Sequence, residues 1–137
     1  MLLIAKEKKA FVIHNRIRRR YHLPTFCVHP ALEQVARRHS EDMIGRDYFS
    51  HETKGRDEGF AARIRRFGYD DYRAVGENIA LGGNPIRIMR AWANSEGHKR
   101  NILNGKFRQV GIGVSTGTYK GRDGVSVYTA DFGAKRR

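Results

Sequence analysis

The stretch VGIGVS at residues 110–115 alternates apolar and small residues with a period of two, which is typical of a half-buried β-strand. A second β-rich run covers residues 125–132, and residues 117–124 between the two runs are rich in turn formers. This pattern predicts a hairpin of two antiparallel strands. Because a lone hairpin is marginal in water, we expect it to pack against helices and to gain a further strand from residues 25–28 or 75–81.

The residues before the hairpin have helical periodicity. Apolar side chains at near-helical spacing predict a first helix over residues 6–21, with the inward positions Phe11, Ile13, Ile17 and Tyr21. A second helix is predicted from Pro30 to about Ile44, and its inward positions are Leu32, Val35, Ala36, His39 and Met43. A third helix is predicted over about 57–67, with Phe60, Ile64 and Phe67 inward, and a fourth from Asn84-Pro85, which carries Ile88, Met89 and Trp92. Helices followed by a hairpin predict a layered α+β domain.

Length and composition bound the class of protein. The 137 residues correspond to one domain, so we expect a single domain over residues 1–137. Hydrophobic residues make up 39% and aromatic residues 10% of the chain, which excludes wholesale disorder. No apolar run approaches the roughly 18 residues of a membrane-spanning helix, so no transmembrane segment is expected. The apolar start at residues 1–5 is too short for a signal peptide and lacks a preceding basic region.

The chain is strongly basic. Lys and Arg number 27 against 14 Asp and Glu, which gives a formal net charge of +13. A field of this size favours polyanions such as nucleic acid, anionic lipid headgroups or acidic cell-surface polymers. The alternative is a solvated positive surface that keeps the protein soluble. The sequence contains no helix-turn-helix, zinc-finger or RNA-recognition signature, so nucleic acid is not the partner that we expect.

Nucleophilic residues give little indication of catalysis. The single cysteine, Cys27, excludes an intrachain disulfide. It stands between Phe26 and Val28, so we expect a buried, inert thiol. Ser50 and Ser95 lie near histidines, but no Gly-x-Ser-x-Gly elbow accompanies either one. A serine nucleophile is therefore not favoured.

Four polar residues from three segments are candidates for a metal site: His51, Glu77, Glu96 and His98. Neutral imidazole nitrogens together with carboxylate oxygens suit Zn²⁺ or a similar divalent cation. The spacing alone is a weak signal, because the sequence has neither a His-x-x-x-His pair nor a cysteine pair. The alternative is that His51 and His98 are hydrogen-bonded loop residues and that Glu77 is a structural acceptor.

Taken in order, these segments resemble prokaryotic members of the CAP superfamily, also called the SCP or sperm-coating-protein domain. The most specific matches are GENIA at residues 76–80 and Trp92 followed by Ser-x-Gly-His at residues 95–98. Further matches are His14-Asn15 with Arg18 and Leu23-Pro24, Ala36 to Met43, Phe49-Ser50-His51, residues 99–103, Phe107, residues 111–114, Tyr128-Thr129 and Phe132-Gly133. The resemblance covers about residues 8–133.

The resemblance implies a three-layer α-β-α sandwich, similar to the PR-1 proteins, with a small antiparallel sheet and a large open cleft. In the family, two histidines and two glutamates line the cleft and can hold a divalent metal. The matching positions here are His51, His98 and Glu77. The family's second glutamate stands three residues after the tryptophan, where this chain has Ser95 and carries Glu96 one position later. One residue is about 100° of rotation on a helix, so Glu96 is a candidate and the site has three or four ligands.

The resemblance also implies a secreted or cell-envelope-associated protein. We expect a binding module whose His/Glu-lined cleft holds Zn²⁺ or another divalent cation and takes a lipid, a peptide or an envelope polymer as its ligand. One alternative is a metal-dependent, peptidase-like hydrolase that uses the same cleft, since a bound metal lowers the pKa of its water. A second alternative is a polyanion or nucleic-acid binder that acts through the basic surface.

Overall fold

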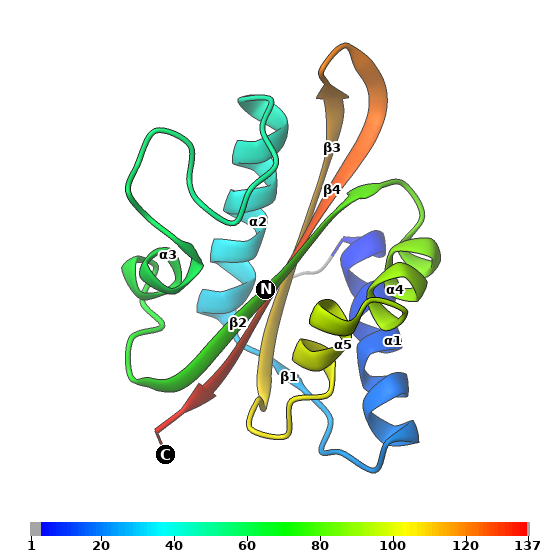
Figure 1. Cartoon of the computed structure of the whole chain (residues 1–137), viewed down its shortest axis with the longest axis vertical. Coiled ribbons are helices and arrows are strands. Elements are labelled where there is room, and N and C mark those ends of the chain that lie inside the picture. Colours follow the sequence, from blue (N-terminus) through cyan, green and yellow to red (C-terminus); the bar gives the residue numbers. More distant parts are fainter. Residues whose placement is uncertain (1–3, 137) are drawn as a thin grey trace.

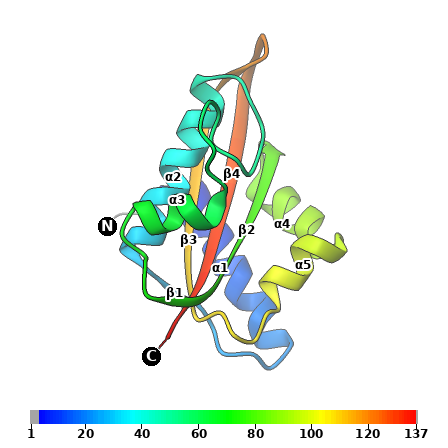
Figure 2. The same ribbon diagram turned by 60° about the vertical axis from the view of Figure 1, so that its left-hand side comes forward.

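The computed structural model describes residues 4–136 and places a sheet between two layers of helices (Figure 1). One face of the sheet is covered by α1 (Ala5–Arg20), α4 (Pro85–Ala93) and α5 (Glu96–Ile102). The other face is covered by α2 (Pro30–Gly45) and α3 (Phe60–Arg66), as Figure 2 shows from a second direction. The predicted α-β-α sandwich is confirmed. Within residues 4–136, no helix combines the length and the apolar character needed to cross a bilayer.

The sheet has four strands in the order β1-β3-β4-β2. The central hairpin pairs β3 (Gln109–Tyr119) with β4 (Arg122–Lys135), and β2 (Tyr72–Gly82) lies antiparallel to β4 at one edge. At the other edge, β1 (Cys27–Val28) pairs with β3 in parallel. Both regions that were expected to add a strand do so. The sheet is mixed rather than purely antiparallel, because a two-residue strand carries no pattern that fixes its direction.

The hairpin turn is tighter than the sequence suggested. Strand β3 continues to Tyr119 and β4 begins at Arg122, so only Lys120 and Gly121 form the turn, in place of the loop predicted over residues 117–124. Both turn residues have positive φ, 48° and 81°. This is the two-residue hairpin turn whose twist matches that of the flanking strands.

Two glycines of β3 let α2 lie directly on the strand backbone. A Cβ added at Gly111 would stand 2.0 Å from the carbonyl carbon of Leu32, and one at Gly113 would stand 2.1 Å from the amide nitrogen of Arg37. No side chain fits in these gaps. The alternation of small and apolar residues in β3 therefore marks a face against which a helix backbone packs.

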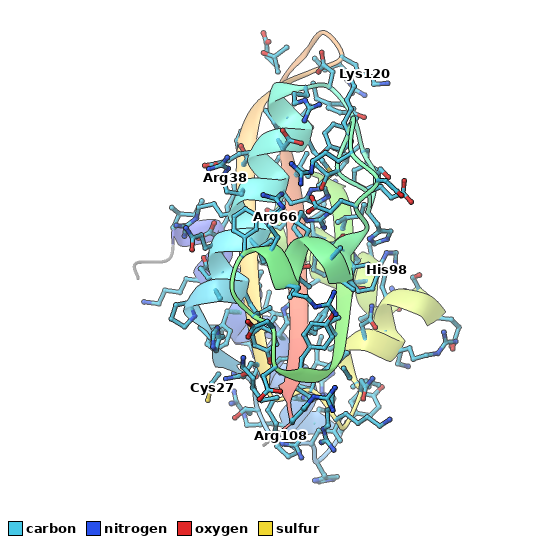
Figure 3. All side chains as sticks on the ribbon, turned by 90° about the vertical axis from the view of Figure 1, so that its left-hand side faces the viewer. Cys27, Arg38, Arg66, His98, Arg108 and Lys120 are labelled. Atoms are coloured by element: carbon cyan, nitrogen blue, oxygen red, sulfur yellow. The ribbon has the colours of Figure 1, made fainter. Side chains whose placement is uncertain are left out.

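Cys27 is exposed, contrary to the prediction of a buried thiol (Figure 3). The neighbouring Phe26 is buried, with 3% of its surface exposed. Successive side chains of an extended segment point in opposite directions, so the burial of Phe26 turns Cys27 outward. An apolar neighbourhood in the sequence therefore did not indicate the orientation of this side chain.

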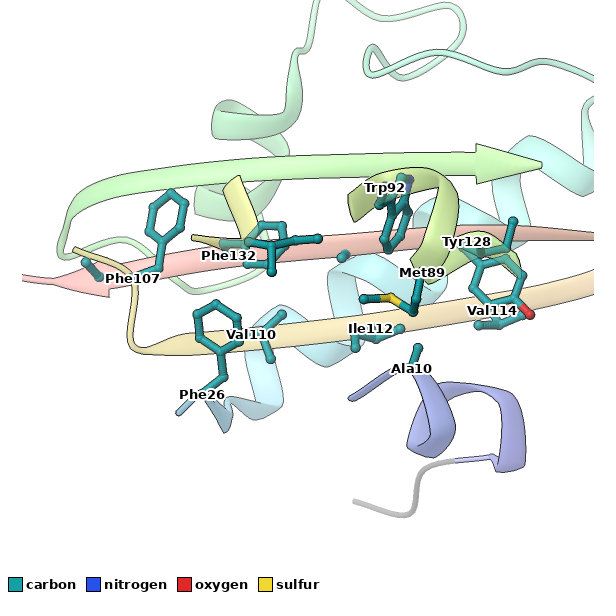
Figure 4. Close-up of a cluster of buried hydrophobic side chains, with 14 residues drawn as sticks. Ala10, Phe26, Met89, Trp92, Phe107, Val110, Ile112, Val114, Tyr128 and Phe132 are labelled. Atoms are coloured by element: carbon teal, nitrogen blue, oxygen red, sulfur yellow. The ribbon is translucent and has the colours of Figure 1, made fainter. Parts of the chain in front are cut away.

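The largest cluster of buried side chains lies between the sheet and the layer formed by α1, α4 and α5 (Figure 4). Met89 and Trp92 from α4 contact this cluster, as predicted. All five inward positions predicted for α2 are buried. In α3, which begins three residues later than predicted, Ile64 is fully buried, and Phe60 and Phe67 pack against it at the rim.

The buried face of α1 differs from the prediction. Its fully buried residues are Glu7, Ala10, His14 and Arg18, whereas Phe11, Ile13 and Ile17 are only partly buried and Tyr21 is 48% exposed. The guanidinium of Arg18 donates to four backbone oxygens, those of Pro24, Ile102, Asn104 and Phe107, at 2.8–3.0 Å. Hydrogen bonds of this kind make burial of a charged side chain possible, and an apolar periodicity cannot reveal them.

Candidate functional site

Glu77 lies at the centre of the candidate site. It stands on β2 with 4% of its surface exposed. Its Oε1 accepts a hydrogen bond from Nδ1 of His51 at 2.8 Å, and its Oε2 accepts one from the guanidinium of Arg63 on α3. Arg63 also donates to the backbone oxygen of His51 at 2.8 Å. The imidazole of His51 is therefore held in place by a carboxylate that is itself held by a buried cation.

These partners keep Glu77 ionised. Burial opposes ionisation, but the hydrogen bond from His51 and the charge of Arg63 outweigh it, so the pKa of Glu77 lies below its usual value. With Nδ1 of His51 donating to a carboxylate, Nε2 is the nitrogen left available to another ligand.

Asp131 is a second buried carboxyl group at the site, and it is not among the site residues predicted from the sequence. It lies on β4 opposite Glu77 in the antiparallel register and is fully buried. Burial raises the pKa of Asp131 well above its usual value, and the neighbouring charge of Glu77 raises it further. Thr129, two residues earlier, is also buried, and its hydroxyl forms a hydrogen bond with the hydroxyl of Ser40 of α2. This period-two repeat of polar residues within an apolar run was the signal available in the sequence.

His98 approaches the same edge strand from α5. The backbone oxygen of His98 accepts a hydrogen bond from Nδ2 of Asn78, the residue that follows Glu77, at 3.0 Å. Nδ1 of His98 lies 2.9 Å from the hydroxyl oxygen of Ser95, so Nε2 is the ring nitrogen of His98 that remains available to another ligand. Burial lowers the pKa of His98, and an electrostatic contribution from His51 lowers it further.

Glu96 does not join these residues. Helix α4 ends at Ala93, and a separate helix, α5, begins at Glu96 with Ser95 as its N-cap. Glu96 is exposed in the first turn of α5, where the negative charge of an acidic side chain interacts favourably with the helix dipole. Among the described residues, it forms no hydrogen bond or ion pair with His51, Glu77 or His98.

The donor set therefore differs from the one expected. Within residues 4–136, no three His, Cys, Asp or Glu side chains are grouped so that they could hold a metal ion. Both oxygens of Glu77 already accept hydrogen bonds, and Glu96 is exposed in the first turn of α5. His51 and His98 each engage one ring nitrogen in a hydrogen bond, and Glu77 orients the imidazole of His51.

Comparison with known proteins identifies the family. Residues 12–132 match the cysteine-rich secretory protein family, CAP. The chain is 37% identical to YkwD of Bacillus subtilis (strain 168) over 110 residues, which are 80% of this chain and 42% of YkwD. It is 34% identical to the membrane protein YlbC of the same organism over 115 residues, 82% of this chain and 32% of YlbC. The chain therefore spans less than half the length of these relatives.

Solved structures agree with this assignment. An extracellular protein with an SCP domain from Bacillus anthracis superposes with a TM-score of 0.81 at 31% identity, over 95% of this chain and 40% of that protein. An outer surface protein of Borrelia burgdorferi superposes with a TM-score of 0.84 at 20% identity, over 99% of this chain and 97% of that protein, and shows the shared fold. From the family match, the relatives and the fold together, the chain belongs to the CAP family of cysteine-rich secretory proteins.

Proposed function

We propose that this chain is a CAP-domain binding module that acts outside the cytoplasm and holds a divalent cation such as Zn²⁺ between His51 and His98. The observation that carries the proposal is the 2.8 Å hydrogen bond between Nδ1 of His51 and Glu77, which fixes the ring and leaves Nε2 free for a metal. A metal-binding histidine typically donates its other ring nitrogen to a carboxylate or a backbone carbonyl in this way.

The second imidazole supports the same arrangement. Ser95 engages Nδ1 of His98, and Asn78 holds its backbone, so the ring position depends on β2 as well as on α5. The lowered pKa of His98 favours the neutral imidazole, which is the form that binds metals. A cation held by two imidazoles would keep open coordination positions for an oxygen atom of a lipid, peptide or envelope-polymer ligand.

The proposed location rests on the relatives and on charge. The Bacillus anthracis relative, 31% identical, is described as an extracellular protein. A net charge of +13 would favour association with anionic envelope surfaces. The hydrolase alternative lacks comparable support, because Glu77 has both oxygens engaged and is not a free general base.

Zinc titration of the metal-free protein by calorimetry tests the proposal. The wild type should bind one ion, and the His51→Ala/His98→Ala double variant should bind it at least about tenfold more weakly. The matched control is His22→Asn, which removes an exposed histidine at a positive φ of 58° that asparagine tolerates. Equal affinity in the wild type, the double variant and the control would dismiss the site.

A further inference from the structure

A cavity of about 210 Å³ lies beside Arg63, between α2, the loop that follows it and α3. Five arginines line it: Arg38, Arg46, Arg56, Arg63 and Arg66. Figure 3 shows Arg38 of α2 and Arg66 of α3 on the same face of the molecule. No lysine lines this cavity, although the chain as a whole is rich in both kinds of basic residue.

The charge of the cavity is only partly balanced by the protein. Asp42 pairs with Arg46, Glu58 pairs with both Arg56 and Arg66, and Glu77 pairs with Arg63. Three carboxylates therefore face five guanidinium groups, which leaves an excess of two positive charges. Within residues 4–136, exposed Arg38 forms no hydrogen bond or ion pair with the protein.

Two buried side chains of the cavity wall also have unused hydrogen-bonding capacity. Arg63 is 2% exposed, and its Nε–H has no hydrogen-bond partner among the described residues. His39 is 1% exposed and donates through Nε2 to the backbone oxygen of Ser50 at 2.8 Å, while its Nδ1 has no partner within the same described range. Buried polar atoms without partners are rare in folded proteins and often mark the place of a ligand or a water.

We propose that this cavity binds a phosphate group. Arginine forks donate in pairs to phosphate oxygens, and the use of arginine without lysine favours this geometry over simple charge attraction. The donors come from three segments of chain, which suits a tetrahedral group with several oxygens better than a planar carboxylate with two. The P–OH of a phosphate monoester or of free phosphate also supplies the donor that Nδ1 of His39 lacks.

A second basic cavity, of about 460 Å³, provides the comparison. Its lining includes Arg73, Arg108 and Arg136 together with Cys27, and Figure 3 shows Cys27 and Arg108 at the other end of the molecule from Lys120. None of the unpartnered buried atoms found in the described part of the chain belongs to its lining. It has positive charge without a buried, unpartnered side-chain atom among the described residues, so it serves as a control for non-specific attraction.

The experiment is a titration with inorganic phosphate, followed by backbone amide chemical shifts at constant ionic strength. The wild type should show saturable binding, and Arg38→Ala/Arg56→Ala should weaken it at least about tenfold. The control Arg73→Ala/Arg136→Ala removes the same charge and should leave the affinity within about twofold, since exposed distant charges are screened. Equal weakening by the two double variants, or no saturation in the wild type, overturns the proposal.

Two further arms separate the phosphate site from the metal site and identify the source of the phosphate. His51→Ala/His98→Ala should keep phosphate affinity, because neither histidine lines the cavity; loss of phosphate binding in this variant would overturn the assignment to the arginines. Dimethyl phosphate lacks a P–OH group and should bind more weakly than inorganic phosphate. Weaker binding would indicate that the ligand is a phosphate monoester or free phosphate. Binding of equal strength would still support a phosphate site and would assign the ligand to a phosphodiester.

Discussion

Glu77 on β2 and Asp131 on β4 are register partners in the antiparallel pair, and both side chains are buried, at 4% and 0% exposure. One buried guanidinium, that of Arg63, forms an ion pair with Glu77. Two carboxyl groups in such a place do not ionise equally, so Glu77 carries the charge and Asp131 favours its protonated form. Glu77 therefore has two roles: it belongs to the buried carboxyl pair between β2 and β4, and it orients the imidazole of His51.

This asymmetry predicts different costs for two isosteric substitutions. Glu77→Gln leaves Arg63 buried without a counter-charge and should lower the free energy of unfolding by about 3 kcal/mol. Asp131→Asn replaces a group that is already uncharged and should cost no more than about 1 kcal/mol. Urea unfolding at pH 7 measures both values. A loss of equal size in the two variants would show that the charge is shared rather than held by Glu77.

Acid sensitivity should depend in part on His14. Burial, with a contribution from the charge of Arg18, lowers the pKa of His14 to about 4 in the folded protein. The unfolded chain takes up this proton near pH 6.5 and the folded chain does not, so the free energy of unfolding should fall as pH is lowered from 6.5 towards 4, by about 3 kcal/mol from this residue. His14→Phe suits a site ringed by Phe26, Trp92 and Phe132 and should flatten this dependence. Identical slopes for the wild type and His14→Phe would contradict the assignment.

Arg18 should be far more sensitive to substitution than its neighbour. Its guanidinium donates to four backbone oxygens, one in the segment after α1, one at the end of α5 and two in the segment after α5. Burial lowers the pKa of Arg18 to about 10. Arg18→Lys keeps the charge but cannot reach all four acceptors, so we expect a loss of about 3 kcal/mol in the free energy of unfolding. The control is Arg19→Lys at an exposed position of the same helix, with an expected change within about 0.5 kcal/mol. Similar midpoints of thermal unfolding for both variants would refute this role.

The contact between α2 and β3 predicts a steric effect at Gly113. A Cβ there would stand 2.1 Å from the amide nitrogen of Arg37, so Gly113→Ala should push the helix from the sheet and cost about 3 kcal/mol or more. Gly83 has no atom within 4 Å of an added Cβ, and Gly83→Ala should change stability by less than about 1 kcal/mol. Chemical denaturation of both variants provides the test, and a tolerated Gly113→Ala would mean that the helix can shift without loss.

Patterns along the chain predicted much of the architecture. The period-two run at residues 110–115 indicated the hairpin, and the helical spacing from Pro30 indicated α2 together with its buried face. Asn84 followed by Pro85 marked the start of α4, and the Asn84 side chain does cap that helix. These predictions succeeded because each depends on residues that are neighbours in sequence, where periodicity and capping act directly.

The sequence by itself determined the family, the α-β-α order of elements and the segments that contribute His51, Glu77 and His98. Only the tertiary structure decided that Arg63 and Asp131 flank Glu77, that Glu96 begins a separate helix and that five arginines share one cavity. The reason is that buried charges depend on partners from other elements. Arg63 is 14 residues from Glu77, and Asp131 reaches it through strand pairing. The period-two repeat of Thr129 and Asp131 marks polar positions in β4, but it does not show that Glu77 is the partner of Asp131.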